Sequence, residues 1–193
     1  MDRNFYWVNI AGVPQWYLTT PVPASGGAFA EPWMFGEGLR LPDPGAIKVR
    51  VRNPGRKRTF VFAGVERTPV VSEAVANAFR AHAPDDVQLF PATVEGDSER
   101  FYIVNATRLS DCIDEVGSRE LQRYAEDESF PENAGQFRWI NGLLIDPVKT
   151  EGARVFRLKK FKTALIVSEG TKTALEQVGD LGVSFEQVTA PRG

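Results

Sequence analysis

Residues 69–94 read PVVSEAVANAFRAHAPDDVQLFPATV, a strand-helix-strand pattern from which the fold class follows. Ser72 is a favoured helix N-cap, and Glu73 places a negative charge in the first helical turn, where the helix dipole favours it. The apolar positions that follow recur at helical spacing, His82 falls on the same face, and Pro84 ends the helix. The pattern predicts a short capped helix between two strands, with His82 packed in the core or at its rim.

A second copy of this pattern lies near the end of the chain. Residues 165–190 read LIVSEGTKTALEQVGDLGVSFEQVTA, and six positions are identical to the first stretch at a constant offset of 96 residues. Any strand-capped helix-strand unit produces such matches, so the repeat indicates shared local architecture without establishing a duplication. We therefore expect an α+β fold with mixed, largely antiparallel sheets, two to three short packed helices and two similar strand-helix-strand units.

The whole chain divides by composition into two parts, which we expect to form one compact unit. Residues 1–67 contain aromatic-rich strands, a loop dense in proline and glycine, and a basic hairpin; residues 68–193 contain the α+β core. Alternating side chains predict a strand over Ile47–Arg52, and Thr59–Phe62 is the expected return strand of that hairpin. A further capped helix is expected over Ser118–Glu126.

Charge is distributed unevenly along the chain, although the formal net charge is only −2. The net charge is +4 for residues 1–68, −9 for residues 69–135 and +3 for residues 136–193. Residues 109–135 alone carry eight acidic side chains against two arginines. Such a run is either a solvated helix and loop or a surface that attracts a basic partner and speeds its association.

The predicted basic hairpin suggests an alternative role. It carries six cations within residues 48–58, and cations on one face of a hairpin can follow a phosphate backbone. The other interpretation is a solvated edge strand whose charges prevent aggregation. The six cations are Lys48, Arg50, Arg52, Arg56, Lys57 and Arg58.

Catalytic and cofactor chemistry finds little support in the sequence. One histidine and one cysteine exclude a disulfide within the chain and a Cys/His zinc cluster, which needs about four ligands. No phosphate-binding loop, dinucleotide fingerprint or nucleophile elbow occurs. Asp111 and Asp114 could bind a divalent cation, or one of them could cap a turn while Cys112 packs in the core. We assign no catalytic, cofactor-binding or metal-binding residue and expect no enzyme.

Targeting and membrane segments are not apparent either. The first residues, MDRNFYWVNIAG, lack the apolar core and the small-residue cleavage pattern of a signal peptide. No stretch approaches 18 consecutive apolar residues, so we expect no membrane span. A cytoplasmic location is the expectation, which a single unpaired cysteine fits.

Four stretches together resemble a family of bacterial immunity proteins encoded beside polymorphic toxins. They are TPVVSEAVANAF followed by DVQLFPATV, FYIVNATRLSDCID, the segment from Leu143 to Leu158, and LIVSEGTKTALEQVGDLGVSFEQV. Their order and spacing match as a set over residues 68–189, whereas the first third of the chain matches only loosely. The resemblance implies a non-enzymatic α+β protein that binds the toxic C-terminal domain of a secreted or contact-delivered effector.

That implication agrees with the acidic middle of the chain. Many such toxins are nucleases, which tend to be basic because they hold phosphates, and an acidic inhibitor can occlude such a site in a tight 1:1 complex. We expect no cofactor, no membrane contact and no direct nucleic-acid contact. The expected toxin contacts are the acidic and aromatic side chains Asp111, Asp114, Glu115, Tyr124, Glu126, Asp127, Glu128, Phe130, Glu132 and Trp139.

Overall fold

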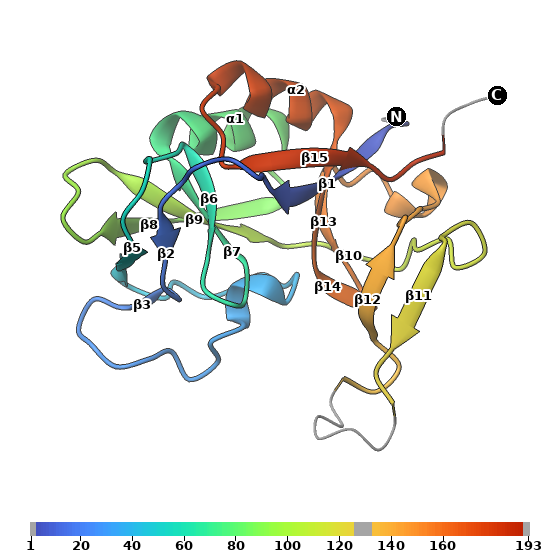
Figure 1. The fold of residues 1–193 in the computed structure, drawn as a ribbon, viewed down its shortest axis with the longest axis horizontal. Helices are drawn as coiled ribbons and strands as arrows, with labels where there is room; N and C mark the ends of the chain where they lie inside the picture. The colour runs from blue at the N-terminus through green and yellow to red at the C-terminus, as the bar shows by residue number, and fades with distance from the viewer. Residues whose placement is uncertain (1–2, 126–132, 191–193) are drawn as a thin grey trace.

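The two repeated stretches form two similar strand-helix-strand units in the computed structural model, which describes residues 3–125 and 133–190 (Figure 1). The Ser72 hydroxyl accepts a hydrogen bond from the Val75 amide, and the Ser168 hydroxyl accepts one from the Thr171 amide, both at 3.4 Å. The caps therefore lie 96 residues apart, as the sequence predicts. The elements are β7 (Thr68–Ser72), α1 (Glu73–His82) and β8 (Val87–Val94), then β14 (Phe161–Ser168), α2 (Glu169–Val178) and β15 (Val183–Gln187).

Each unit holds a third, antiparallel strand between its two parallel strands. In the first unit this strand is β9 (Phe101–Ala106), which pairs with both β7 and β8. In the second unit it is β1 (Phe5–Ile10), which pairs with both β14 and β15. In the first unit the inserted strand follows the unit in the chain, and in the second unit it comes from the start of the chain. The two units therefore have the same strand arrangement, but the inserted strand is connected to each unit differently.

The second unit belongs to a five-stranded sheet with the order β10-β13-β14-β1-β15. Its remaining strands are β10 (Leu109–Ser110) and β13 (Val155–Leu158), which pair in parallel, while the other neighbours are antiparallel. Helices α1 and α2 lie side by side over one face of the sheets (Figure 1). The fold class is therefore α+β with mixed, largely antiparallel sheets, as predicted.

The first unit belongs to a larger sheet with the order β3-β4-β8-β9-β7-β6-β2-β5. Strands β4 and β5 are adjacent in the chain, yet β4 pairs with β8 near one end of this order and β5 pairs with β2 at the other. The sheet must therefore curl until its ends meet, as in a barrel. The additional strands are β2 (Tyr17–Leu18), β3 (Val22–Pro23), β4 (Ile47–Val49), β5 (Val51–Asn53) and β6 (Phe60–Ala63).

This closure corrects the predicted basic hairpin. Strand β5 does not return along β6; it pairs with β2, which lies between them. The alternating pattern predicted one strand over residues 47–52, but the strand is interrupted at Arg50. Strand β4 pairs with β3 and β8, and the partner of β5 comes from the aromatic-rich start of the chain. A one-turn helix, η1 (Met34–Gly36), buries Phe35 against Phe90 in the barrel core.

A separate two-stranded hairpin projects from the molecule and corrects a second prediction (Figure 1). It consists of β11 (Glu120–Arg123) and β12 (Phe137–Asn141), where we expected a capped helix over residues 118–126. The Ser118 hydroxyl caps no helix: it donates to the Asp114 carbonyl at 2.7 Å and accepts from the Leu144 amide at 2.9 Å. Pairing with β12 supplies the backbone hydrogen bonds that a helix would have supplied.

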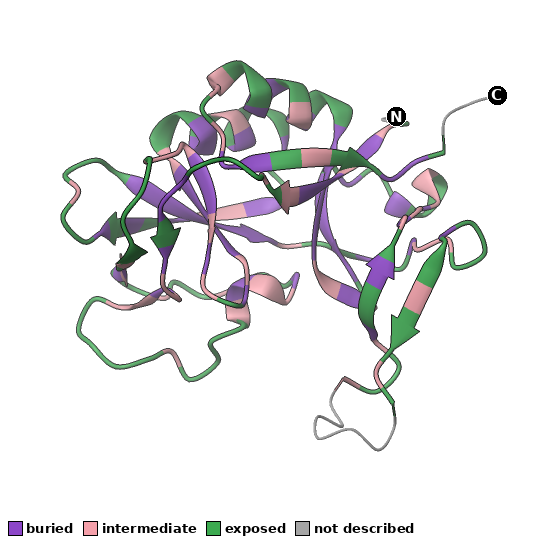
Figure 2. Cartoon of the chain, viewed as in Figure 1, coloured by how far each residue is buried: buried purple, intermediate pink, exposed green. Residues whose placement is uncertain are grey.

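Burial follows three apolar clusters, which lie in the barrel, under the two helices, and between the five-stranded sheet and the hairpin (Figure 2). Cys112 is fully buried in the third, as expected for a free cysteine. His82, by contrast, is exposed, which contradicts its predicted packing. The helix ends there, and Ala83 is buried instead. Within the described residues, no helix is long and apolar enough to cross a bilayer.

Candidate partner-binding surfaces

The acidic segment begins in a network beside the projecting hairpin, at the end of the ladder next to the β11–β12 connection. The Glu115 carboxylate lies 2.6 Å from Nη2 of Arg123 and 3.0 Å from Nζ of Lys160, and Asp111 lies 3.8 Å from the same Lys160 ammonium. Hydrogen bonds from Lys160 and Arg123 hold the pKa of the Glu115 carboxyl below its ordinary value. Arg123 also stacks over the Phe137 ring at 4.2 Å. The network joins the start of the segment and the end of β11 to the turn between β13 and β14.

Asp114 has a local structural role. Its Oδ1 accepts hydrogen bonds from the amides of Val116 and Gly117, at 3.1 and 2.9 Å, so it caps the turn that leads into β11. This is one of the two roles that the sequence left open. Within residues 3–125 and 133–190, no group of three or more histidine, cysteine or acidic side chains is placed to hold a metal ion.

The outward face of the hairpin carries an exposed tryptophan. Trp139 on β12 is 48% exposed and lies opposite Gln122 on β11, while the Leu121–Ile140 pair turns inward to the core. Tyr124 is half-buried just beyond β11, and its amide donates to the Gln136 carbonyl at 3.0 Å. An aromatic side chain on a projecting two-stranded element is well placed to anchor a partner.

Five of the expected contact residues lie in the connection between β11 and β12, outside the described residues. They are Glu126, Asp127, Glu128, Phe130 and Glu132. The other five lie within the described residues: Asp111, Asp114, Glu115, Tyr124 and Trp139. The structure brings Asp111 and Glu115 together at Lys160 and places Tyr124 and Trp139 on or beside the hairpin.

The basic segment is largely neutralised by the protein's own carboxylates. Lys48 and Arg50 pair with Glu95, and Lys57 lies 2.7 Å from Asp97. Arg56 and Arg58 both contact Oδ1 of Asp180, at 2.8 and 2.6 Å. A phosphate backbone would have to displace these carboxylates, so the arrangement does not favour nucleic-acid binding by this segment.

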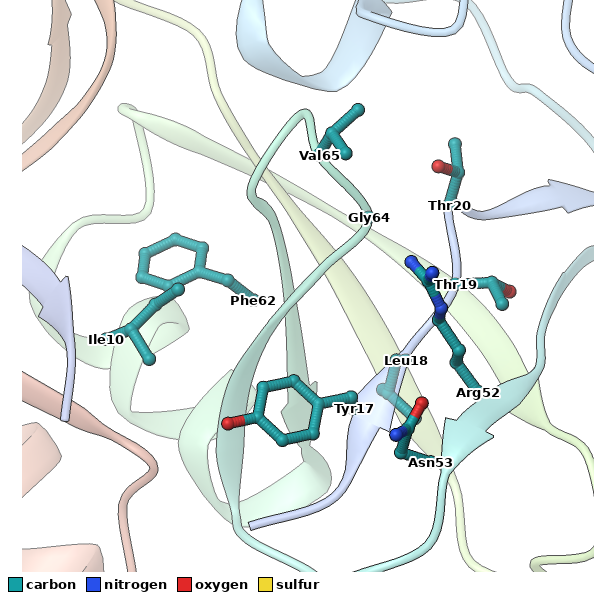
Figure 3. Close-up of a pocket in the computed structure, with 10 residues that line it drawn as sticks. All are labelled: Ile10, Tyr17, Leu18, Thr19, Thr20, Arg52, Asn53, Phe62, Gly64 and Val65. Atoms are coloured by element: carbon teal, nitrogen blue, oxygen red, sulfur yellow. The ribbon is translucent and has the colours of Figure 1, made fainter. Parts of the chain in front are cut away.

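An open groove of about 630 Å³ lies beside the barrel (Figure 3). Its walls come from four segments: the end of β1, strand β2, strand β5 and the turn between β6 and β7. Three large apolar side chains at the groove are half or more exposed: Ile10, Tyr17 and Val65. Arg52 on β5 supplies the positive charge in its lining.

Sequence reasoning missed both the groove and the cations beside the acidic segment. The groove unites residues from 10 to 65, and no local pattern links them. Lys160 lies 45 residues from its partner Glu115, and only the pairing of distant segments brings the two together. The one signal in the sequence was the density of aromatic residues near the chain start, which we assigned to core strands.

A comparison with protein families identifies one match. Residues 27–190 match the family described as "Immunity protein family (Imm11)". The match covers most of the chain and confirms the resemblance stated from the sequence. No curated protein matches the chain.

Proposed function

The chain belongs to the Imm11 immunity protein family, and on that premise we propose that it neutralises a basic nuclease toxin by occluding the toxin's active site. Immunity proteins bind cognate toxins, and the family is non-enzymatic. We propose in addition that the toxin is a basic nuclease, that the projecting hairpin binds it, and that the two proteins form a 1:1 complex in the cytoplasm.

The observation that carries this proposal is the exposed Trp139 on a projecting hairpin whose connecting sequence is acidic. Nearly half of its side chain is exposed although it sits in the middle of β12. Interface hot spots are enriched in tryptophan, and burying such a ring removes a large apolar area from water. Its position opposite Gln122 gives the anchor a polar neighbour that can hydrogen-bond to a partner.

Electrostatics supports a basic partner for the same hairpin. Arg123 and Lys160 offset Glu115 and Asp111 beside it. The sequence EDESFPE of residues 126–132 carries four acidic side chains and no basic one. Negative charge therefore concentrates in the connection between β11 and β12. A one-sign region of this kind accelerates encounter with a basic protein and excludes a polyanionic substrate from the occupied site.

Co-expression tests the function itself. The toxin domain encoded beside this protein is produced in a bacterial host with and without it, and growth and co-purification are measured. We expect growth to stop without the protein and to recover with it, in a complex of one copy each. Failure to rescue growth or to co-purify would reject the proposal.

A matched pair of tryptophan substitutions tests the surface. Trp139 and Trp33 are each 48% exposed, but Trp33 lies in the loop before η1, away from the hairpin. Trp139→Ala should weaken the complex about 30-fold, the equivalent of roughly 2 kcal/mol at a hot spot. Trp33→Ala should leave the affinity unchanged. Equal effects of the two substitutions would remove the hairpin from the interface.

Charge reversal tests the electrostatic part separately. Replacing Glu126, Asp127 and Glu128 together by lysine should slow association at low salt, and the difference should shrink as salt rises. The measurement is the association rate by surface plasmon resonance at two ionic strengths. An unchanged rate at low salt would show that these charges do not guide the toxin.

A further inference from the structure

The groove beside the barrel leaves apolar surface uncovered. Tyr17 is 57% exposed and Val65 is 75% exposed, and both belong to its lining with Ile10. Figure 3 shows these side chains around the open space, with Phe62 behind them. Clustered exposed apolar side chains with a polar rim are characteristic of an interaction surface.

Arg52 at the rim differs from the other cations of its segment. Lys48, Arg50, Arg56, Lys57 and Arg58 each pair with a carboxylate of the protein. Within residues 3–125 and 133–190, Arg52 forms no ion pair, although it alternates with Lys48 and Arg50 along the chain. Its guanidinium extends over the groove between Thr19 and Gly64 (Figure 3).

The surroundings of the groove strengthen its positive character. Arg67 lies over the Phe62 ring at 5.0 Å and its Nη2 donates to Asn9 at 3.4 Å. The nearby Glu66 carboxylate is buried and accepts a hydrogen bond from the Thr20 hydroxyl at 2.8 Å, so it does not line the groove. Among the described residues, no acidic side chain lines it. Arg52 and Arg67 together outweigh the one buried Glu66 carboxylate, so a negatively charged occupant is complementary.

The backbone at the groove suits an extended occupant. Among the described residues, strands β2 and β6 pair in parallel through a single residue pair, Leu18 with Ala63. The pairing of these two strands is therefore minimal where the groove lies, between the end of β1 and the β6–β7 turn. A peptide in extended conformation can lie along such a seam with alternate side chains in the groove.

We propose that this groove binds an extended segment of a partner protein in which a carboxylate neighbours an aliphatic or aromatic side chain. The apolar side chain packs among Ile10, Tyr17 and Val65, and the carboxylate pairs with Arg52. This goes beyond the toxin contact at the hairpin, because the groove has the opposite charge and is built from other elements.

A second copy of the chain is a poorer occupant. In a symmetric dimer the same patch of both copies meets, so groove-to-groove contact would bring two Arg52 side chains into one interface. The mutual repulsion of these two like charges opposes that contact. The charge that the groove lacks must come from a different surface.

Selection of displayed peptides tests this proposal and does not require the partner to be identified. A library of random octapeptides on phage is panned against the full-length protein. We expect enriched peptides to contain aspartate or glutamate next to a large apolar residue. Tyr17→Ala, which changes an exposed side chain, should abolish the enrichment; Val65→Asp is the second variant for the same wall.

Reversing the charge of the rim gives the sharpest result. Arg52→Glu should lower affinity for the best synthetic acidic peptide about tenfold and should shift selection toward peptides with lysine or arginine. Arg40→Glu, which changes another exposed arginine outside the groove, is the matched control and should alter neither result.

Several outcomes would overturn the proposal. They are the absence of enriched peptides, enrichment that Arg52→Glu leaves acidic, and enrichment that both Tyr17→Ala and Val65→Asp leave intact. Concentration-dependent self-association that Tyr17→Ala abolishes, measured by analytical ultracentrifugation, would assign the groove to a second copy instead. Because toxin rescue and the Trp139 comparison involve the hairpin, failure here leaves the proposed function standing.

Discussion

Asp86 fastens the first strand-helix-strand unit to the five-stranded sheet, and its removal should be costly. Its carboxylate is buried in the loop between α1 and β8. Oδ2 accepts hydrogen bonds from the amides of Arg154 and Val155 at the start of β13, at 2.7 and 3.3 Å. Oδ1 accepts from Nε of Arg108 at 3.2 Å. One side chain thus serves three donors from two other segments.

The magnitude follows from what Asp86→Ala leaves without an acceptor. The buried Val155 amide costs about 1–3 kcal/mol when it loses its acceptor, and the part-buried Arg154 amide adds about 1 kcal/mol. The Arg108 side chain is 54% exposed, so its ion pair adds about 1 kcal/mol at most. The sum is about 2–5 kcal/mol, a large share of the 5–15 kcal/mol that is typical of a domain.

Equilibrium unfolding in urea, followed by circular dichroism, measures this loss. Asp86→Asn retains one acceptor oxygen and should cost about half as much. Asp85→Ala, at the exposed neighbouring position, is the control and should stay within about 0.5 kcal/mol of the parent. A loss below 1 kcal/mol for Asp86→Ala, or equal losses for Asp86→Ala and Asp85→Ala, would refute the assigned role.

Two further predictions concern titratable groups. Burial raises the pKa of the Cys112 thiol to about 11, so only about 0.1% of it is thiolate at pH 8. An aromatic disulfide reagent should therefore react with the native protein at least about a hundredfold more slowly than with the unfolded protein. Comparable reaction rates would contradict this. The Glu115 carboxyl has a lowered pKa, so its ion pairs stabilise the fold above its unfolded-state pKa and are lost as pH falls through the folded-state value. Lys160→Met should raise the Glu115 pKa, measured by carboxyl carbon NMR, and an unchanged value would show that Lys160 does not set it.

Local patterns predicted α1, α2 and their caps correctly. The hydrogen bonds that begin α1 and α2 join Ser72 and Ser168 to amides three residues along, so every participant is visible in a short window. The buried state of Cys112 and the turn-capping role of Asp114 also follow from residue type and immediate neighbours.

Strand partners could not be predicted in the same way. The alternation over residues 47–52 indicates a strand, but the hydrogen bonds of β5 go to Tyr17 and Leu18, more than 30 residues away. The segment after Ser118 has a plausible helix cap, yet its backbone pairs with β12. In both cases a distant segment supplied the backbone hydrogen bonds, and such pairing overrides a local preference.

The candidate surfaces divide along the same line. The acidity of residues 109–135 is a property of composition, and the partner surface expected there stays a prediction. Lys160 offsets the charge of Glu115, although it lies in a part of the chain that comes after β12. The groove depends still more on the fold, because its walls come from four segments.

Residue order alone is sufficient for the caps of α1 and α2, the two strand-helix-strand units, the family resemblance and the acidic middle, since each rests on contacts or counts within a short stretch. The barrel closure, the hairpin that presents Trp139 and the position of Arg52 at an apolar groove arise only when distant strands meet. Strand pairing depends on the burial and hydrogen bonding of the whole chain. Pairing in turn decides which distant residues share a surface, and therefore the charge and apolar character of that surface.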